Sequence, residues 1–288
     1  MDMSNAQRAQ VLVEALPYIQ KYYGKTIVVK YGGNAMINDE LKHDVMRDMV
    51  LLNLIGVRVV LVHGGGPEIS AMLKRVGKQS QFVDGLRVTD EETSEIVQMV
   101  LAGKINKSLV AKLDNLGGRA MGICGMDGGL IEARQIDERL GYVGEIVRVN
   151  PTPISDLLEK GYIPVVSTIG CDASGHVYNI NADTAAASVA SALHAECLIS
   201  MTDTPGLLRD ASDPSSLIRR LSLQQMERLK EDGIISGGMI PKIDCCIRAI
   251  REGVRKVFII DGRVPHALLI ELLTDEGAGT LFKKEFTK

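Results

Sequence analysis

Residues 26–33 read TIVVKYGG, and residues 57–66 read VRVVLVHGGG. Each stretch begins as a short, continuous run rich in β-branched residues and ends in glycines. Such runs are typical of strands that are buried on both faces, as in a parallel sheet covered by helices. Glycine lets the backbone turn and approach a ligand closely. The two stretches therefore predict a parallel sheet with a ligand site beyond the carboxyl ends of its strands, where open α/β sheets bind their ligands.

Three more runs of this kind lie at 163–166, 197–200 and 257–260. Segments with helical spacing separate the runs, and they lie at about 39–54, 66–76, 90–116, 153–160, 181–195, 222–231 and 238–252. This alternation predicts an α/β fold, a three-layer αβα sandwich with a mainly parallel central sheet. Residues 119–150 break the pattern, because GMDGG and LGYVG interrupt short strand candidates, and we expect hairpins there.

The composition excludes several functional classes. The 288 residues include 33 Lys and Arg against 36 Asp and Glu, so the chain lacks the basic excess of a nucleic-acid-binding surface. No apolar run approaches the ~18 residues of a membrane span. The first ten residues lack a signal-peptide layout, and the five cysteines form no C-x-x-C pair, which favours reduced thiols in a cytoplasmic protein. The five histidines show no zinc spacing, so we expect no metal site built from side chains.

The segment before the first core strand predicts an amphipathic helix over residues 1–24. Pro17 should kink this helix, and Gly24 should end it. The helix could pack on its own core, or it could be an intersubunit helix, because the sheet does not need it. The apolar residues at helical spacing are Val11, Leu12, Ala15, Leu16, Ile19 and Tyr22.

Several polar or glycine-rich segments follow predicted strands or begin predicted helices. Amides at a helix N-terminus favour anions, which makes 63–67 (HGGGP) and 237–242 (GGMIPK) candidate anion sites. Arg87, in the turn GLRVT, is a candidate for bidentate binding of a carboxylate, the alternative being a surface arginine. Asn179 and Asn181 precede a helix of small residues, where they could also serve as turn and capping residues.

Three competing motifs fail on spacing. A Walker A loop ending at Gly24-Lys25-Thr26 would need glycine at Ile19, and this tripeptide precedes a strand. The dinucleotide motif G-x-G-x-x-G fails because Ile69 occupies its last glycine position. The HGGG segment resembles a hydrolase oxyanion loop, but the chain has no G-x-S-x-G.

The glycine loops and polar groups imply phosphoryl transfer, which depends on positioning and charge neutralisation more than on a covalent catalyst. A carboxylate acceptor is already ionised and needs no general base. It must approach a polyanionic nucleotide against charge repulsion, which two lysines on opposite sides would offset. Lys30 and Lys242 fit these roles, with Asp183 between them to hold both ammonium groups.

Five motifs occur in the order seen in the amino acid kinase family: KYGGN (30–34), HGGGP (63–67), GLRVT (85–89), NINADTAA (179–186) and GGMIPK (237–242). The chain most resembles the acetylglutamate kinases of arginine biosynthesis within that family. The resemblance implies an αβα sandwich that phosphorylates the γ-carboxylate of N-acetyl-L-glutamate with ATP and Mg²⁺, giving N-acetyl-L-glutamyl 5-phosphate. Two alternatives stay open: another kinase of this fold, and a non-catalytic amino-acid sensor.

The resemblance also assigns roles by motif position. It implies that Lys30 and Lys242 stabilise the transition state and that Asp183 organises them. The Mg²⁺ is held mainly by phosphates in this family, so no protein ligand is named. The implied substrate-binding residues are Gly65, Gly66, Arg87, Asn179 and Asn181. The implied nucleotide- and phosphate-binding residues are Gly32, Gly33, Thr202, Asp203, Gly206, Ile235, Ser236 and Met239.

The N-terminal LPYIQKYYGK resembles the arginine-sensitive branch, in which an extra helix interlaces dimers into a hexamer, a trimer of dimers. Arginine inhibits those enzymes near that helix. The polar loop 210–216 (DASDPSS) resembles the type that binds the PII signalling protein. We expect a regulatory segment at 1–24, an acetylglutamate-binding and dimerisation lobe at 25–195 and a nucleotide-binding lobe at 196–288. The candidate allosteric residues are Tyr18, His266, Leu268, Glu276 and Gly279.

Overall fold

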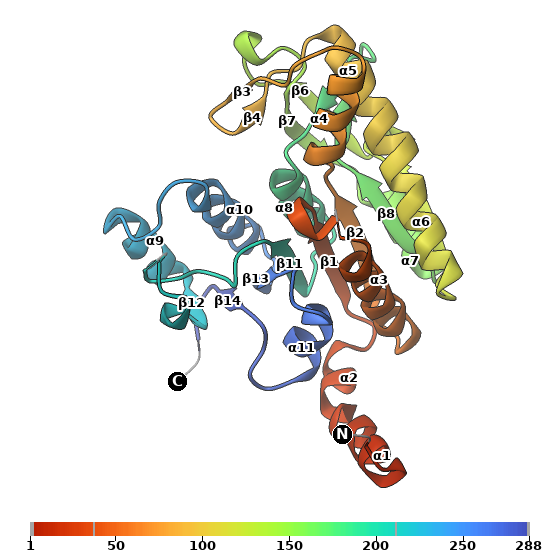
Figure 1. The fold of residues 1–288 in the computed structure, drawn as a ribbon, viewed down its shortest axis with the longest axis vertical. Coiled ribbons are helices and arrows are strands. Elements are labelled where there is room, and N and C mark those ends of the chain that lie inside the picture. Colours follow the sequence, from red (N-terminus) through yellow and green to blue (C-terminus); the bar gives the residue numbers. More distant parts are fainter. Residues whose placement is uncertain (1–2, 37, 211, 287–288) are drawn as a thin grey trace.

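A computed structural model describes residues 3–36, 38–210 and 212–286, and it has a mainly parallel eight-stranded sheet at its centre (Figure 1). The strand order is β12-β14-β13-β11-β1-β2-β8-β5, and every neighbouring pair is parallel except β13 and β14. The strands are β1 (Thr26–Tyr31), β2 (Arg58–His63), β5 (Ala120–Cys124), β8 (Ile163–Ser167), β11 (Cys197–Thr202), β12 (Arg220–Ser222), β13 (Lys256–Asp261) and β14 (Thr280–Lys283).

Alternate residues of the central strands enter two separate cores, one on each face of the sheet. In β1, Ile27 and Val29 belong to one core and Val28 to the other, and all three are fully buried. A strand with both faces covered needs apolar residues at every position. This explains why the strands read as continuous runs of Val and Ile, and it confirms the predicted parallel sheet.

Helices cover both faces, which confirms the three layers. One core takes side chains from α3 (Asp39–Leu54), α4 (Gly66–Arg75), α5 (Glu91–Gln98), α6 (Asn106–Asn115) and α11 (Ala267–Leu273). The other takes them from α7 (Thr152–Glu159), α8 (Ala182–Ala192), α9 (Leu223–Glu231) and α10 (Met239–Arg251). The expected helix at 90–116 is interrupted between α5 and α6 by a π-helical stretch, η2 (Met99–Ile105). Short 3₁₀ turns complete the chain at η1 (Gly33–Met36), η3 (Asp127–Gly129), η4 (Glu138–Leu140) and η5 (Pro214–Ser216).

The prediction of hairpins throughout 119–150 is only partly right. Strands β6 (Ile131–Gln135) and β7 (Gly144–Val149) do form an antiparallel pair, in a small sheet with β9 (Ile169–Cys171) and β10 (Val177–Asn179). Strand β5, however, is a parallel edge strand of the main sheet. It carries a glycine and is half-exposed, so it lacks the apolar run of a fully buried strand. The prediction for this strand is therefore wrong.

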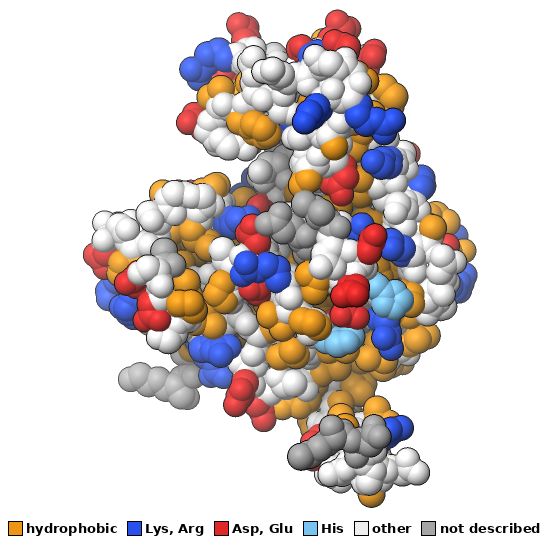
Figure 2. Space-filling model, viewed as in Figure 1, with side chains coloured by type: hydrophobic (Ala, Val, Ile, Leu, Met, Phe, Trp, Pro, Cys, Tyr) orange, Lys and Arg blue, Asp and Glu red, His pale blue; other side chains and the backbone are white. Residues whose placement is uncertain are grey.

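The N-terminal segment forms two helices rather than one kinked helix. Helix α1 (Asn5–Glu14) begins with a capping box between Ser4 and Gln7, and α2 (Leu16–Tyr22) has Pro17 in its first turn, where a missing N–H costs little. Helix α1 buries no residue and stands apart from the body of the molecule (Figures 1 and 2). In the described structure, only α2 is anchored, through the buried Tyr22. The reading of 1–24 as packed on its own core is therefore wrong for α1.

Two further observations concern membrane spans and metal sites. No helix among the described residues has both the length and the apolar character that a membrane span requires. Within the same residues, no three His, Cys, Asp or Glu side chains converge in a way that could hold a metal ion.

Candidate active site

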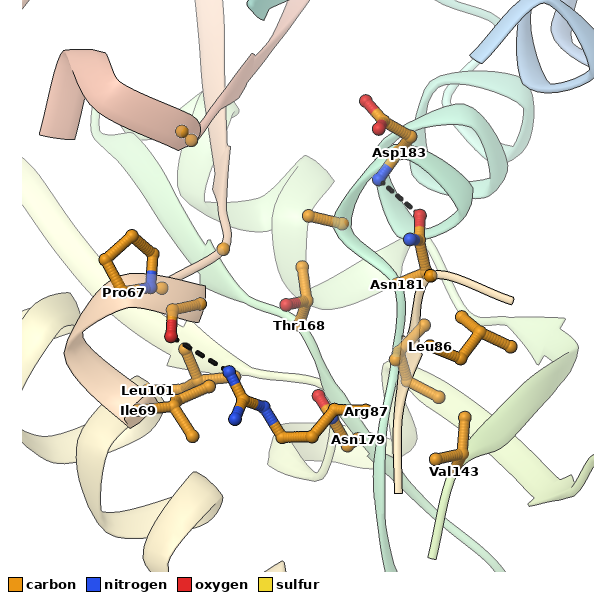
Figure 3. Close-up of a pocket in the computed structure, with 18 of the residues that line it drawn as sticks. Pro67, Ile69, Leu86, Arg87, Leu101, Val143, Thr168, Asn179, Asn181 and Asp183 are labelled. Atoms are coloured by element: carbon orange, nitrogen blue, oxygen red, sulfur yellow. Dashed lines mark hydrogen bonds between the residues drawn. The ribbon is translucent and has the colours of Figure 1, made fainter. Parts of the chain in front are cut away.

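The carboxyl ends of β1 and β2 open into a cavity of about 310 Å³. Its walls come from both glycine loops, from the hairpin of β3 (Phe82–Val83) and β4 (Leu86–Arg87), and from the start of α8 (Figure 3). Segments far apart in sequence meet here because parallel strands end at one edge of the sheet. The predicted site residues that line this cavity are Lys30, Gly32, Gly33, Gly65, Gly66, Arg87, Asn179, Asn181 and Asp183.

Asp183 joins the two predicted lysines. Lys30 Nζ lies 3.0 Å from Asp183 Oδ1, and Lys242 Nζ lies 3.0 Å from Asp183 Oδ2. Lys30 is 7% exposed. Burial by itself would raise the pKa of the Asp183 carboxyl, but the charges and hydrogen bonds of Lys30 and Lys242 outweigh it and lower the pKa below its ordinary value. The carboxylate therefore stays ionised and holds both ammonium groups at one point.

Local structure fixes the Asp183 side chain. The residue lies in the first turn of α8, whose N-cap Asn181 accepts hydrogen bonds from the backbone N–H groups of Asp183 and Thr184. Ser200 Oγ donates to Asp183 Oδ1 over 3.1 Å. Asn181 is thus both a helix cap and a lining residue of the cavity. The sequence left two roles open for Asn181, a helix cap and a substrate-binding residue, and its position in the structure is compatible with both.

Arg87 is a buried cation, only 6% exposed. Its Nη1 donates to Ser80 Oγ at 2.5 Å, and its Nη2 donates to Gly66 O and Ser70 Oγ, both at 2.9 Å. Burial lowers the pKa of its guanidinium. Among the described residues, no carboxylate pairs with Arg87, so a buried positive charge faces the cavity with hydroxyl and carbonyl oxygens as its partners. Such a group favours an anionic ligand, and the surface-arginine alternative is wrong.

The glycine loops bring the backbone close to these groups. A side chain at Gly32 would begin 3.6 Å from Lys30 Nζ, and Gly33 has a φ of +71°, which favours glycine. A Cβ on Gly65 would lie 2.2 Å from Ile105 Cδ1, so any larger residue there would require the Ile105 side chain to shift. Gly66 opens α4, where unpaired amides favour an anion.

The hairpin that carries Arg87 forms one wall of the cavity. Asp84 and Gly85 have φ values of 50° and 79°, so the two-residue turn that joins β3 and β4 has the left-handed backbone of a tight hairpin. Phe82 lies beside Arg87, with the guanidinium carbon 4.7 Å from its ring centroid. Figure 3 shows Arg87 beside the start of α4, with Asn179 next to it. Asn179 Nδ2 donates to Thr89 Oγ1 at 3.5 Å, which ties β10 to the hairpin's end.

The predicted nucleotide residues do not line this cavity, apart from Gly32 and Gly33. Thr202 ends β11, next to β1, and its hydroxyl is 2.9 Å from Thr204 Oγ1. Asp203 follows it, and Gly206 has a φ of +140°. Ile235 is 2% exposed, so its side chain belongs to the core and only its backbone could meet a ligand. Met239 begins α10, about one turn before Lys242, and Ser236 precedes the helix.

The predicted allosteric residues are spread over two places. Glu276 and Gly279 line a second cavity, of about 230 Å³, between α2, α11 and β14. Tyr18 hydrogen bonds Asp275, another residue of that wall, which raises the pKa of the Tyr18 hydroxyl. Leu268 is fully buried, so its side chain offers nothing to a ligand. His266 instead lies at the other end of α11, with Nδ1 2.6 Å from Asp48 Oδ1.

Sequence reasoning missed several residues of the site. Thr168, Leu86 and Val143 line the first cavity, and Ser70, Ser80 and Ser200 hold its charged side chains. Only Leu86 had a signal, because it lies inside the GLRVT motif. The serines are common residues in unremarkable loops, helices or strands, and only the fold shows which polar groups they meet.

The family model described as "Amino acid kinase family" matches residues 25–261. The chain belongs to the amino acid kinase family. Its relatives in that family include an acetylglutamate kinase from Brachyspira hyodysenteriae, 55% identical and covering 99% of both chains. Another is an acetylglutamate kinase from Synechococcus elongatus, 56% identical over 96% of this chain and 92% of that protein. The chain is therefore an enzyme of the amino acid kinase family.

Solved structures agree on the fold. N-acetylglutamate synthase from Neisseria gonorrhoeae, complexed with coenzyme A and N-acetyl-glutamate, superposes with a TM-score of 0.84 at 28% identity. That match covers 97% of this chain and 64% of the synthase, so this chain spans about two thirds of the longer protein. Carbamate kinase from Giardia lamblia shares the fold of this family at a TM-score of 0.66 and 17% identity.

Proposed function

We propose that this kinase transfers the γ-phosphoryl group of ATP to the γ-carboxylate of N-acetyl-L-glutamate, giving N-acetyl-L-glutamyl 5-phosphate and ADP in arginine biosynthesis. One observation carries the proposal: Lys30 and Lys242 meet on the two oxygens of Asp183, beside a cavity that contains the buried cation Arg87. The names of relatives more than 50% identical to this chain support the same substrate.

The substrate suits the charges of the cavity. Arg87 would bind the α-carboxylate, which takes no part in the reaction, through a two-pronged ion pair. The γ-carboxylate would then lie near Lys30 and the amides of Gly65 and Gly66. Asn179 and Asn181 would contact the remaining polar atoms of the substrate. The apolar Leu86 and Val143 also line this cavity and could pack against the acetyl group.

The chemical step moves one phosphoryl group. A γ-carboxylate oxygen forms a bond to the γ-phosphorus as the bond from that phosphorus to the ADP oxygen breaks. Negative charge builds up on the transferring group and on the leaving oxygen, and Lys30 and Lys242 would stabilise this charge from two sides. Asp183 would hold both lysines in place before ATP arrives, so little reorganisation is needed during the reaction.

ATP would bind along the ends of β1 and β11 and the start of α10. Gly32 and Gly33 would hold the transferring phosphate. The remaining contacts would come from Thr202, Asp203, Gly206, Ile235, Ser236 and Met239. Since no three possible ligand side chains converge among the described residues, Mg²⁺ would be held mainly by the phosphates of ATP.

A coupled assay of ADP formation tests the proposal. Acetylglutamate, glutamate, aspartate, carbamate and UMP are offered separately as acceptors at equal concentration. We expect acetylglutamate to give the highest kcat/KM. A preference for any of the other four would refute the assignment and point to another kinase of this fold. Arginine binding in a calorimeter without turnover of any acceptor would instead point to a non-catalytic sensor.

We also propose that L-arginine inhibits the enzyme by binding at the second cavity. This cavity holds the carboxylates of Glu271, Asp275 and Glu276, which suit a guanidinium, as well as several lysines and arginines that suit a carboxylate. Helix α2 forms part of its wall through Lys21 and Tyr22. The exposed apolar residues Val11, Leu12 and Val13 on α1 support a role for that helix in joining dimers into a hexamer.

Three further proposals concern the lobes, a partner and the location of the protein. The lobes 25–195 and 196–288 would bind acetylglutamate and nucleotide respectively, and the first would also form the dimer. The loop 210–216, of which Ala211 lies outside the described residues, would be a docking site for PII. All five cysteines are unpaired, which supports a cytoplasmic location.

A further inference from the structure

His63 ends β2 directly before the three glycines, and its ring is completely buried. Its Nδ1 lies 2.9 Å from Gly64 O, and its Nε2 lies 3.3 Å from Asn106 Nδ2. A carbonyl oxygen can only accept, so Nδ1 carries the hydrogen. An amide nitrogen can only donate, so Nε2 is the acceptor. The two contacts define one neutral tautomer.

Asn106 begins α6, directly after the π-helical stretch, and is 1% exposed. Its Nδ2 also lies 2.8 Å from Val165 O and 3.3 Å from Ile123 O, so the two amide hydrogens are shared among three acceptors. Three acceptors around one nitrogen fix the orientation of this amide, because the opposite orientation would set Oδ1 against two carbonyl oxygens. The Asn106 amide thus links Nε2 of the ring to backbone carbonyls of β5 and β8.

The hydrogen bond to Gly64 O has a consequence for the next amide. The structure has no cis peptide bond among the described residues, so the Gly65 N–H points opposite to the Gly64 carbonyl. The carbonyl faces the buried ring, whereas Gly64, Gly65 and Gly66 all line the substrate cavity. Among the described residues, no acceptor meets the Gly65 N–H. Leu101 and Ile105 of the π-helical stretch lie where a Cβ on Gly65 would be.

We propose that His63 is a positioning residue, which sets the Gly64–Gly65 peptide so that the Gly65 N–H points at the reacting carboxylate, and that Asn106 holds His63 in the required tautomer. This inference rests on the proposed function. Neither side chain touches the substrate. Burial lowers the pKa of the His63 ring to about 4, so the ring stays neutral and Nε2 stays an acceptor at neutral pH.

Two substitutions separate positioning from packing. In His63→Asn, the amide nitrogen replaces Nδ1 and can still donate to Gly64 O. In His63→Gln, the longer amide reaches toward Asn106 and leaves Gly64 O without its donor. An amide that stabilises a developing negative charge contributes about 10²-fold or more to kcat. We therefore expect kcat of H63Q to fall at least about tenfold below that of H63N, with the KM for ATP unchanged in both.

The exposed His43, on α3, provides the control for a histidine-to-glutamine change, and H43Q should match the wild type. Equal kcat values for H63N and H63Q would overturn the proposal, as would a loss confined to ATP binding. If the wild type itself shows no turnover of acetylglutamate, the proposed function fails, and the ring can still be tested directly.

The second measurement needs no active variant. Nitrogen NMR of the wild-type enzyme, labelled with ¹⁵N at histidine, reports which ring nitrogen carries hydrogen. The His63 ring should show a protonated Nδ1 and an unprotonated Nε2 at neutral pH. The opposite tautomer or a charged ring would overturn the proposal even if neither variant folds.

Discussion

Ser200 lies directly across from Lys30 in the parallel pair of β11 and β1, and both side chains contact the same atom, Asp183 Oδ1. Lys242 takes the other carboxylate oxygen. The centre of the site is thus one carboxylate with three donors, drawn from two strands and one helix. The two lysines supply positive charge, whereas the serine donates a hydrogen bond from an uncharged hydroxyl.

Replacing Ser200 should therefore have a small effect. Ser200→Ala removes a hydrogen bond from an uncharged hydroxyl and leaves both ion pairs of Asp183 in place. We expect kcat to fall less than about tenfold. Steady-state kinetics with acetylglutamate and ATP measures this. A fall of about a hundredfold or more would mean that the hydroxyl, rather than the lysines, sets the geometry of Asp183.

Removing Lys242 should be far more damaging. In Lys242→Ala, one of the two cations that meet the transferring phosphate is lost, so kcat should fall by about 10²-fold or more. The KM for acetylglutamate should change little. The control is Lys284→Ala, which removes an exposed lysine that does not line the cavity. An unchanged kcat would remove Lys242 from the mechanism.

Arg87 should act on substrate binding rather than on chemistry. Arg87→Ala removes the partner of a carboxylate that does not react, and a hydrogen bond to a charged group contributes about 1.5–3 kcal/mol. The KM for acetylglutamate should rise about ten- to a hundredfold, with a smaller change in kcat. Kinetics at varied acetylglutamate and varied ATP separates the two effects. A change in the KM for ATP alone would show that the role is wrongly assigned.

Deleting residues 1–14 removes α1 and keeps Tyr22, the buried anchor of α2. Since α1 buries no residue of this chain, the truncated enzyme should fold and keep its activity without arginine. The proposed hexamer should be replaced by a smaller assembly, and arginine inhibition should weaken. Light scattering after size-exclusion chromatography and inhibition curves measure these effects. Full inhibition of a truncated dimer would contradict the regulatory role of α1.

Asp48 should make stability depend on pH. Burial raises the pKa of its carboxyl to about 6, although the hydrogen bond from His266 opposes this. The folded state then holds a proton that the unfolded state has released between about pH 4 and about pH 6, so the free energy of unfolding falls as the pH rises through that range.

Asp48→Asn should remove this part of the pH dependence. Denaturant unfolding at a series of pH values compares the variant with the wild type. The wild type should lose stability relative to Asp48→Asn as the pH rises to about 6, by roughly 3 kcal/mol at most, and the difference should stay constant above that range. A difference that does not change with pH would contradict the raised pKa.

The sequence predicted the central strands well, because burial on both faces demands apolar residues throughout. Val28 and Val29 face opposite cores, yet both must be apolar. Strand β5 escaped prediction because it is a half-exposed edge strand. Its Gly122 lies so close to Asn106 that a Cβ would come within 1.9 Å of Oδ1, a restriction that only tertiary structure imposes.

The site was predictable where a functional residue lies at the end of a strand, as Lys30 does. The meeting of Asp183 with Lys242, 59 residues away, follows no local rule, and it was expected from the charge requirements of phosphoryl transfer and from the family resemblance. The serine partners of Arg87 could not be predicted, because the hydroxyl of Ser80 reaches the guanidinium only after the hairpin has folded back.

The hydrogen-bonded pair β1–β11 also limits how the molecule can flex. Lys30 and Ser200 are paired in one register, so they move as a unit. Asp183 and Lys242 lie on α8 and α10, which share a single core. A large separation of the two lysines would break the ion pairs of Asp183, whereas movement of the β3–β4 hairpin would break the hydrogen bonds of Arg87 to Gly66 and Ser70. We therefore expect the hairpin, rather than the carboxylate at the centre, to move when substrates enter and leave.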